Sequence, residues 1–385
     1  MKKKKQQGIF IGLMSGTSID GIDVAIIRDR PHFLKTRACP YFFYAYPKKI
    51  KKKLLKVFKD PKSNLKYIKA LDNKLGSLFA EAVIKSLKIL KIKSSEVKAI
   101  GSHGQTVWHK PYGKNPFSLQ IGNPRIIFEK TKIPVIYNFR EKDILAGGQG
   151  APLTPFLDWF LFKNKKKNMV LINIGGISNI TFIPKDGSIK KVIGFDTGPG
   201  NMLIDQAMRY YYKKNYDNNG FTASKGTINH KILNKLLSHK YFLKKPPKST
   251  GHEDFGGNYF NMIKKYFYGL KKKDIIVTLT AFTSYSILQQ IKNILINNKV
   301  KEIVFSGGGA KNNTILNIFK NLLGENNLKI KLKTFDQLNL PFSSDAKEAV
   351  LIALLAYCYI NKIPSNIPSV TGSKKRVILG NDIGL

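Results

Sequence analysis

Cysteine is scarce in this chain, and its scarcity excludes whole classes of site. The two cysteines, Cys39 and Cys358, lie far apart in the sequence. Disulfide scaffolds and cysteine-based metal sites need several cysteines at short, defined spacings. The pair therefore predicts two free, buried thiols in a protein of a reducing compartment, the cytoplasm.

Long apolar runs are also missing. The most membrane-like segment, residues 349–360 (AVLIALLAYCYI), has about half the length that a membrane-spanning helix needs. Residues 1–16 begin with lysines and an apolar stretch, but no cleavage site of small residues follows before the polar cluster. We therefore expect a soluble protein with no membrane partner.

Acidic residues and arginine are rare, although the chain is strongly basic. It has 24 Asp and Glu against 66 Lys and Arg, which gives a net charge of +42. The excess is almost all lysine, in short runs along the chain, with no single basic stripe and no aromatic residues interleaved at a stacking spacing. The pattern favours a solvated surface and no specific nucleic-acid partner, with weak polyanion binding as the alternative.

The length and pattern of the chain predict two α/β domains. Its 385 residues are 43% hydrophobic, which is enough for two cores. Strand-like and helix-like segments alternate, as in α/β proteins. A strand–turn–strand pattern occurs twice, over residues 8–27 and 169–184, which indicates a duplicated architecture with a cleft between the halves. We place the domains at 1–165 and 166–385.

Several elements can be predicted from local pattern. Residues 97–104 (VKAIGSHG) are typical of a strand that runs into a glycine turn, and residues 192–201 (VIGFDTGPGN) of a strand that ends in an acidic, glycine-rich loop. In the last predicted helix, Asp345 and Glu348 have the spacing of a capping box. The apolar periodicity predicts helices over 73–90, 155–163, 273–295 and 343–360.

The first strand–turn–strand segment contains GLMSGTSIDGID, residues 12–23. Glycine lets backbone N–H groups approach a phosphate, and Ser and Thr hydroxyls add donors. We interpret the segment as a phosphate cradle, with Asp20 and Asp23 near a cation. The alternative is a tight turn that simply uses glycine and serine.

Two later turns have a similar composition. NIGGISNIT, residues 173–181, repeats the first turn without an acid, and SGGGAKN, residues 306–312, lies between a predicted strand and a helix. A turn of the second kind can hold the phosphates or ribose of a nucleotide. It is not a Walker loop, because no GKS or GKT follows the glycines. Ordinary structural turns remain the alternative for both.

Three further motifs contain residues that could carry chemistry. Asp196 in GFDTGPGN suits a general base or a metal contact, or else an Asx-turn. His103, Gln105 and His109 in GSHGQTVWH could contact a ligand; the alternative is local turn capping or a buried, hydrogen-bonded histidine. Arg140 in FREKDILAGGQGAPL could clamp an anion, or form a structural pair with Asp143.

Together these motifs resemble those of the anhydro-N-acetylmuramic acid kinase family. The resemblance runs in order through nearly the whole chain and implies the fold of the actin, hexokinase and sugar-kinase superfamily. That fold has two ribonuclease-H-like (actin-like ATPase) domains with an interdomain nucleotide and sugar cleft. The motifs that carry it are GLMSGTSIDGID, GSHGQTVWH, LQIGNP, FREKDILAGGQGAPLTP, NIGGISNIT, GFDTGPGNMLID, PPKSTGHEDF, GGGAKN and SVTGSKKRVILG.

The resemblance also implies a reaction: ATP and Mg²⁺ would be used to open 1,6-anhydro-N-acetylmuramic acid and phosphorylate its O6, in cell-wall recycling. Asp196 matches the catalytic base, and Glu348 an acid that faces the active site. The sugar would lie near His103, Gln105, Arg140, Gly148 and Gly150. The nucleotide would be bound by Gly12, Leu13, Met14, Ser15, Gly16, Thr17, Ser18, Ile19, Asp20, Gly175, Gly176, Gly307, Gly308 and Gly309.

Some points stay open at this stage. The pattern assigns no ligand to Mg²⁺, and it leaves open whether the protein is a homodimer. TLTAFTSYSI, YDNNGFTASKG and the KKR of the last motif depart from the family pattern, but none of them touches Asp196 or the glycine turns. The alternatives are a kinase of an ordinary amino sugar on the same fold and a lysine-rich polyanion-binding protein without catalysis.

Overall fold

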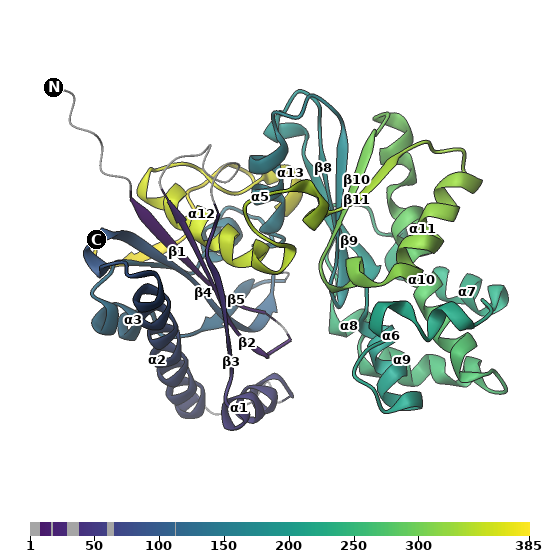
Figure 1. Ribbon diagram of the computed structural model, residues 1–385, viewed down its shortest axis with the longest axis horizontal. Helices are drawn as coiled ribbons and strands as arrows, with labels where there is room; N and C mark the ends of the chain where they lie inside the picture. The colour runs from purple at the N-terminus through teal and green to yellow at the C-terminus, as the bar shows by residue number, and fades with distance from the viewer. Residues whose placement is uncertain (1–7, 17, 29–37, 60–64, 112) are drawn as a thin grey trace. The chain divides into compact units, whose positions relative to one another are not determined.

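The chain forms two compact α/β units in the structure, a computed structural model (Figure 1). The structure describes residues 8–16, 18–28, 38–59, 65–111 and 113–385. Unit 1 comprises the chain up to residue 157 together with residues 340–385, and unit 2 comprises residues 158–339. The predicted assignment of 340–385 to the second domain is therefore wrong.

Unit 1 is built on a mixed sheet of the order β12-β6-β4-β1-β2-β3, with β5 paired to β4. β1 is antiparallel to β2 and parallel to β4, and β4 is parallel to β6. The strands are β1 (Ile9–Ser15), β2 (Gly21–Arg28), β3 (Tyr41–Ala45), β4 (Val97–Lys110), β5 (Phe117–Ile121), β6 (Val135–Tyr137) and β12 (Asn381–Ile383).

Helices cover both faces of this sheet. Side chains point to alternate faces along β1, and apolar residues on both faces need a layer that buries them. Ile11 and Leu13 lie in the core with α2, whereas Phe10 points the other way, onto Tyr357 of α12. Figure 1 shows α2 and α3, which lie side by side. The helices are α1 (Lys48–Lys59), α2 (Leu65–Leu90), α3 (Pro124–Thr131), α4 (Glu141–Leu145), α12 (Lys347–Ile360) and α13 (Pro368–Thr371).

The return of the chain to unit 1 depends on the close packing of α12 against β1 and β4. A β-carbon at Gly12 would overlap the main chain of Ala349 and Ala353, and one at Gly101 would overlap that of Ile352. Glycine at these two positions lets the helix approach the strands. The capping box predicted for this helix is wrong: α12 begins after Ala346, and no side chain caps it.

Unit 2 has a five-stranded sheet of the order β11-β10-β7-β8-β9. β7, β8 and β9 form an antiparallel meander, and β10 is parallel to both β7 and β11. Five strands of unit 1, β3-β2-β1-β4-β6, have the same arrangement, which is that of ribonuclease-H-like domains and confirms the predicted duplication. The strands are β7 (Met169–Ile174), β8 (Ile177–Ile183), β9 (Ile193–Pro199), β10 (Glu302–Ser306) and β11 (Lys331–Thr334).

The core of unit 2 lies between its sheet and a helical layer centred on α10, which packs against α7, α11 and β9 (Figure 1). Helix α5 (Thr154–Phe162) contains the boundary between the units. The other helices are α6 (Met202–Ala207), α7 (His230–Leu237), α8 (His252–Phe255), α9 (Gly257–Ile263), α10 (Lys272–Asn297) and α11 (Asn313–Glu325).

Most local predictions are confirmed, including both strand–turn–strand units and all four helices. The predicted turn at residues 101–104 is wrong, because β4 continues through Gly104 to Lys110 and pairs with β5. Cys39 and Cys358 are buried and form no disulfide, as expected. Among the helices that the structure describes, none is both long enough and apolar enough to span a membrane.

Candidate active site

Asp196 is held in a defined position within unit 2. Its backbone N–H donates to the carbonyl of Lys248 (3.3 Å), and its own carbonyl accepts from the hydroxyl of Tyr241 (2.5 Å). Its side-chain Oδ2 accepts from the backbone N–H of Thr250 (2.9 Å). The carboxylate is therefore fixed from both its main chain and its side chain.

The environment of Asp196 suits a general base. Burial raises the pKa of its carboxyl from 3.8 to about 7, partly opposed by the N–H of Thr250 and the ammonium of Lys248. A base works best when its pKa lies near the operating pH. The prediction that this residue follows the end of a strand is wrong. Asp196 lies inside β9, opposite Asn179 of β8.

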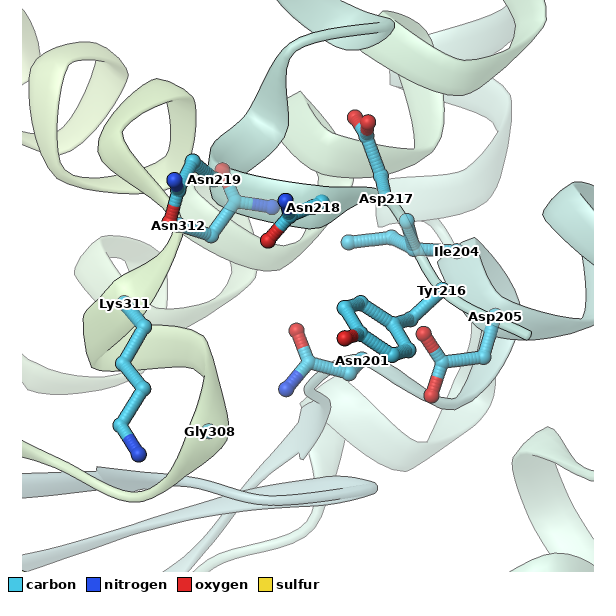
Figure 2. Close-up of a pocket in the computed structure, with 10 residues that line it drawn as sticks. All are labelled: Asn201, Ile204, Asp205, Tyr216, Asp217, Asn218, Asn219, Gly308, Lys311 and Asn312. Carbon is cyan, nitrogen blue, oxygen red and sulfur yellow. The ribbon is translucent and has the colours of Figure 1, made fainter. Parts of the chain in front are cut away.

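A cavity of about 370 Å³ lies in the same unit (Figure 2). Figure 2 shows Lys311 and Gly308 on one side and Tyr216 and Asp205 on the other, with the side chain of Asn201 between them. Amide, carboxylate and aromatic groups of this kind can bind the hydroxyls of a ribose and a planar base. The lining residues are Asn201, Ile204, Asp205, Tyr216, Asp217, Asn218, Asn219, Gly308, Lys311 and Asn312.

Some of the lining side chains build the wall and others are exposed. Both carboxylate oxygens of Asp217 accept backbone N–H groups of the following turn, and Asn312 caps α11 through the N–H groups of its first turn. Asn218 and Asn219, by contrast, are exposed. The exposed amides are the ones that can reach a ligand.

In the predicted glycine turns of unit 2, some glycines pack against the sheet and others line the cavity or are exposed. β-Carbons at Gly307 and Gly309 would crowd Ile174 of β7, so these two glycines allow the turn to pack on the sheet. Gly308 lines the cavity. In the β7–β8 turn, the carbonyls of Gly175 and Gly176 accept N–H groups of residues 200–202, and Gly176 is exposed.

In unit 1, only some residues of the predicted phosphate cradle, residues 12–20, can reach a ligand at the surface. Gly12, Leu13 and Ile19 are buried, and Leu13 and Ile19 belong to the core. Ser18 and Asp20 are exposed, with the Ser18 hydroxyl donating to the Asp20 carboxylate (2.7 Å), while Met14 and Gly16 are partly buried. Thr17 lies outside the described residues.

The shape of this turn depends on a buried hydrogen-bond chain. The hydroxyl of Tyr46 donates to that of Ser15 (2.8 Å), and Ser15 donates to Oε1 of Gln105 (2.7 Å). Nε2 of Gln105 donates to the carbonyl of Gly16 (3.1 Å). Gln105 is fully buried and so supports the turn, although the resemblance placed it near the sugar.

Arg140 and His103, both predicted to lie near the sugar, are hydrogen-bonded to each other. Nδ1 of His103 lies 3.0 Å from the carbonyl of Gly104, which can only accept, so the proton is on Nδ1. Its Nε2 therefore accepts from Nε of Arg140 (3.1 Å). Burial and the guanidinium lower the pKa of His103 to about 3, which keeps the ring neutral and able to accept.

The guanidinium of Arg140 is also tied to the glycine-rich loop of its own motif. Its Nη1 donates to the carbonyl of Gly150 (2.7 Å). Burial lowers the pKa of Arg140 to about 10, a value that still keeps it charged at neutral pH. The further N–H groups of the guanidinium can donate to an anionic or hydroxylated ligand.

Asp143 does not serve as the hydrogen-bond partner of Arg140. It is fully buried, and its Oδ2 accepts the backbone N–H of Gly150 (2.8 Å). Its Oδ1 accepts from Asn366 and from Thr371, each at 2.8 Å. The SVTG motif thus holds the loop of Gly148 and Gly150 in place from residues more than two hundred positions later in the chain.

Glu348 lies in the first turn of α12, and its side chain still reaches solvent. Desolvation raises the pKa of its carboxyl, and the Arg140 guanidinium opposes the rise. Burial also raises the pKa of Asp23, to about 6, while a hydrogen bond from Tyr41 lowers it. Among the described residues, no three His, Cys, Asp or Glu side chains gather as a metal site.

Comparison with known proteins decides the family. The profile of the family described as "Anhydro-N-acetylmuramic acid kinase" matches residues 8–383. The chain belongs to the anhydro-N-acetylmuramic acid kinase family. Relatives of that name are 40% identical in Caldanaerobacter subterraneus (98% of this chain, 97% of the relative), 41% in Bacillus cereus (96% and 97%) and 42% in Clostridioides difficile (96% and 97%).

In this member of the anhydro-N-acetylmuramic acid kinase family, sequence reasoning missed several residues of the site. PPKSTGHEDF carried the resemblance, yet its Lys248 and Thr250 had no assigned role. The cavity residues 216–219 lie in YDNNGFTASKG, a segment that departs from the family pattern. A cluster of Asp, Asn and Gly there was the available signal, because such residues form turns that expose polar groups.

Proposed function

We propose that this chain is an ATP-dependent kinase that hydrolytically opens 1,6-anhydro-N-acetylmuramic acid and phosphorylates O6. Water attacks C1, the bond between C1 and O6 breaks, and O6 takes the γ-phosphoryl group of ATP. The products are N-acetylmuramate 6-phosphate and ADP, in the recycling of cell-wall sugar. Membership of the family supports this assignment.

The observation that carries the mechanism is the environment of Asp196. A base that deprotonates water must be ionised near neutral pH and must also hold a proton once it has one. A pKa of about 7 and three hydrogen bonds that fix the residue provide these properties. Asp196 would accept the proton of the attacking water.

Each unit, taken by itself, has residues that suit one part of ATP. In unit 2, the cavity of Figure 2 suits the nucleoside, because exposed amides and the ring of Tyr216 face the Gly308 turn. In unit 1, the β1–β2 turn with Ser15, Gly16 and Ser18 is the proposed phosphate cradle. Phosphoryl transfer depends mainly on placement and on neutralisation of charge, which these backbone and hydroxyl groups can provide.

Mg²⁺ fits the donor set of the β1–β2 turn. In phosphoryl-transfer sites this ion is held by one or two carboxylates, by waters and by the phosphates themselves. The exposed carboxylate of Asp20, next to the proposed cradle, is such a donor, so a cluster of three acids is not required. When bound, Mg²⁺ would neutralise charge on the phosphates.

Arg140 is the proposed anchor for the sugar. Muramic acid carries a carboxylate, and a guanidinium is well suited to bind one. His103 and Gly150 orient the guanidinium while leaving it further N–H groups. Glu348, which lies in the electrostatic field of Arg140, is the proposed second acid at the sugar.

The decisive experiment runs the reaction in heavy-oxygen water and stops it before the two anomers equilibrate. If water attacks C1, the label lies at C1, the phosphate ester keeps the bridge oxygen, and one anomer forms first, as in inverting glycosidases. Mass spectrometry and NMR read both results. Label in the phosphoryl group, or a product with a closed bridge, would leave only an ATPase or an ordinary sugar kinase.

The cytoplasm is the proposed location, because ATP is present there and the two cysteines form no disulfide. A homodimer stays a prediction that light scattering can test. Neither property enters the mechanism.

A further inference from the structure

Lys248 is a buried lysine next to Asp196. Only 4% of its surface is exposed, which is rare for lysine unless the ammonium has partners. Its Nζ donates to Oε1 of Gln290 in α10 (2.5 Å). It also lies 4.6 Å from the ring centroid of Tyr241 and 5.6 Å from that of Phe195, within the range of cation–π interactions.

These contacts fasten the segment that holds Asp196. Tyr241 lies in a 3₁₀-helix, Lys240–Leu243, and the chain runs on through Lys248 to Thr250. Tyr241, the carbonyl of Lys248 and the N–H of Thr250 each bind Asp196, whereas the side chain of Lys248 binds α10 and two rings. The side chain thus joins this segment to α10, whose packing on β9 fixes the strand that carries Asp196.

We propose that Lys248 is a positioning residue for the reaction. Its ammonium, held by Gln290 and two aromatic rings, keeps the segment 241–250 in the place where it fixes Asp196, and it supplies positive charge beside the carboxylate. The proposal rests on the proposed function of Asp196 as the base.

The charges around Asp196 determine the direction of the electrostatic effect. Lys248 lowers the pKa of Asp196 and Glu253 raises it. From the packed elements, β8 presents Asn179 opposite Asp196, α10 contributes Gln290, and the 3₁₀-helix contributes the hydroxyl of Tyr241. Burial and the charge of nearby Lys244 lower the pKa of Lys248 to about 8, so it is charged where Asp196 titrates.

The test is the variant Lys248→Met, which keeps the apolar stem and removes the charge. Without the ammonium, the pKa of Asp196 rises, so the acid limb of the kcat profile moves to higher pH by about half to one unit. At pH 7 we expect kcat to fall about 3–10-fold, while the KM for ATP stays within about twofold. Lys244→Met is the matched control, since its exposed ammonium also lies over Tyr241 (5.5 Å) and should move neither quantity.

Lys248→Arg separates geometry from charge. The larger guanidinium keeps the charge but cannot occupy the same space, so kcat should fall while the acid limb stays in place. Wild-type kcat in Lys248→Arg would overturn the proposal. If Lys248→Met does not fold, the kcat of Lys248→Arg is the measurement that tests the proposal.

Asp196→Asn, measured in parallel, distinguishes the two levels of the argument. If it keeps near-normal turnover, the assignment of the base fails, whatever Lys248 does. If it loses turnover while Lys248→Met keeps the wild-type kcat and acid limb, the base assignment stands and the role of Lys248 is overturned. A selective ¹³C titration of the Asp196 carboxyl in Lys248→Met and the wild-type protein reads the pKa without reference to activity.

Discussion

Asp196→Asn should make the protein more stable at alkaline pH while it removes activity. The pKa of this carboxyl rises from an ordinary 3.8 to about 7 in the folded protein, chiefly because the fold takes the partly buried group out of contact with water. A raised carboxyl pKa means that the folded state binds the proton more tightly, so the free energy of unfolding decreases as the pH rises from about 4 to about 7. At about 1.4 kcal/mol for each pKa unit, the full effect is about 4 kcal/mol. An amide has no such ionisation, so the variant avoids this loss.

Urea unfolding at pH 5 and pH 8, followed by circular dichroism, measures the effect. The stability difference between variant and wild type should grow with pH towards about 4 kcal/mol, while turnover falls about 10²–10⁴-fold. The control is Asp186→Asn, because Lys191 lowers the pKa of that exposed carboxyl and the variant should gain nothing as the pH rises. A variant advantage that is the same at both pH values would refute the reasoning.

Three further predictions concern other parts of the chain. Gly16→Val should leave the free energy of unfolding within about 0.5 kcal/mol, because Ser18 Oγ, at 3.7 Å, is the nearest described atom to a β-carbon there once the chain neighbours are set apart. In separate calorimetric titrations it should weaken ATP binding more than sugar binding, whereas equal losses would indicate misfolding. Thr371→Val removes a hydrogen bond to the buried carboxylate of Asp143 and should lower the free energy of unfolding by about 1.5–3 kcal/mol; unchanged urea unfolding would contradict this. Duplex DNA should bind weakly, without sequence preference, and much less as salt rises; tight binding to one sequence at physiological salt, in a fluorescence-anisotropy titration, would contradict it.

The parts of the fold that could be predicted are those encoded by neighbouring residues. The hairpins β1–β2 and β7–β8 follow from apolar runs on either side of a polar, glycine-rich turn. The continuation of β4 through Gly104 could not be predicted, because its pairing with β5 outweighs the local signal of a glycine turn. The return of α12 to unit 1 depends on contacts of Gly12 and Gly101 with residues far along the chain, which no local pattern specifies.

The candidate site, too, could be predicted only in part from the sequence. The motifs indicated Asp196 and Arg140, because an acid or a cation among glycines is conspicuous. They could not show that His103 and Gln105 act by supporting Arg140 and the β1–β2 turn, since that depends on which partners the fold brings within reach. Lys248 was hidden among many lysines, nearly all of which a sequence-based argument assigns to the solvated surface.

The contacts of residues 340–385 with unit 1 bear on the order in which the protein folds during its synthesis. β12 pairs with β6, α12 packs on β1, and Asp143 binds Asn366 and Thr371, so none of these contacts can form until the ribosome has made the corresponding residues. Unit 2 is a continuous segment and can fold first. At roughly 5–20 residues per second, the loop that orients Arg140 waits about 10–40 seconds for its partners, which lie more than two hundred residues later. A fragment of residues 1–339, released from the ribosome, should therefore contain a protease-resistant unit 2 and a protease-sensitive unit 1.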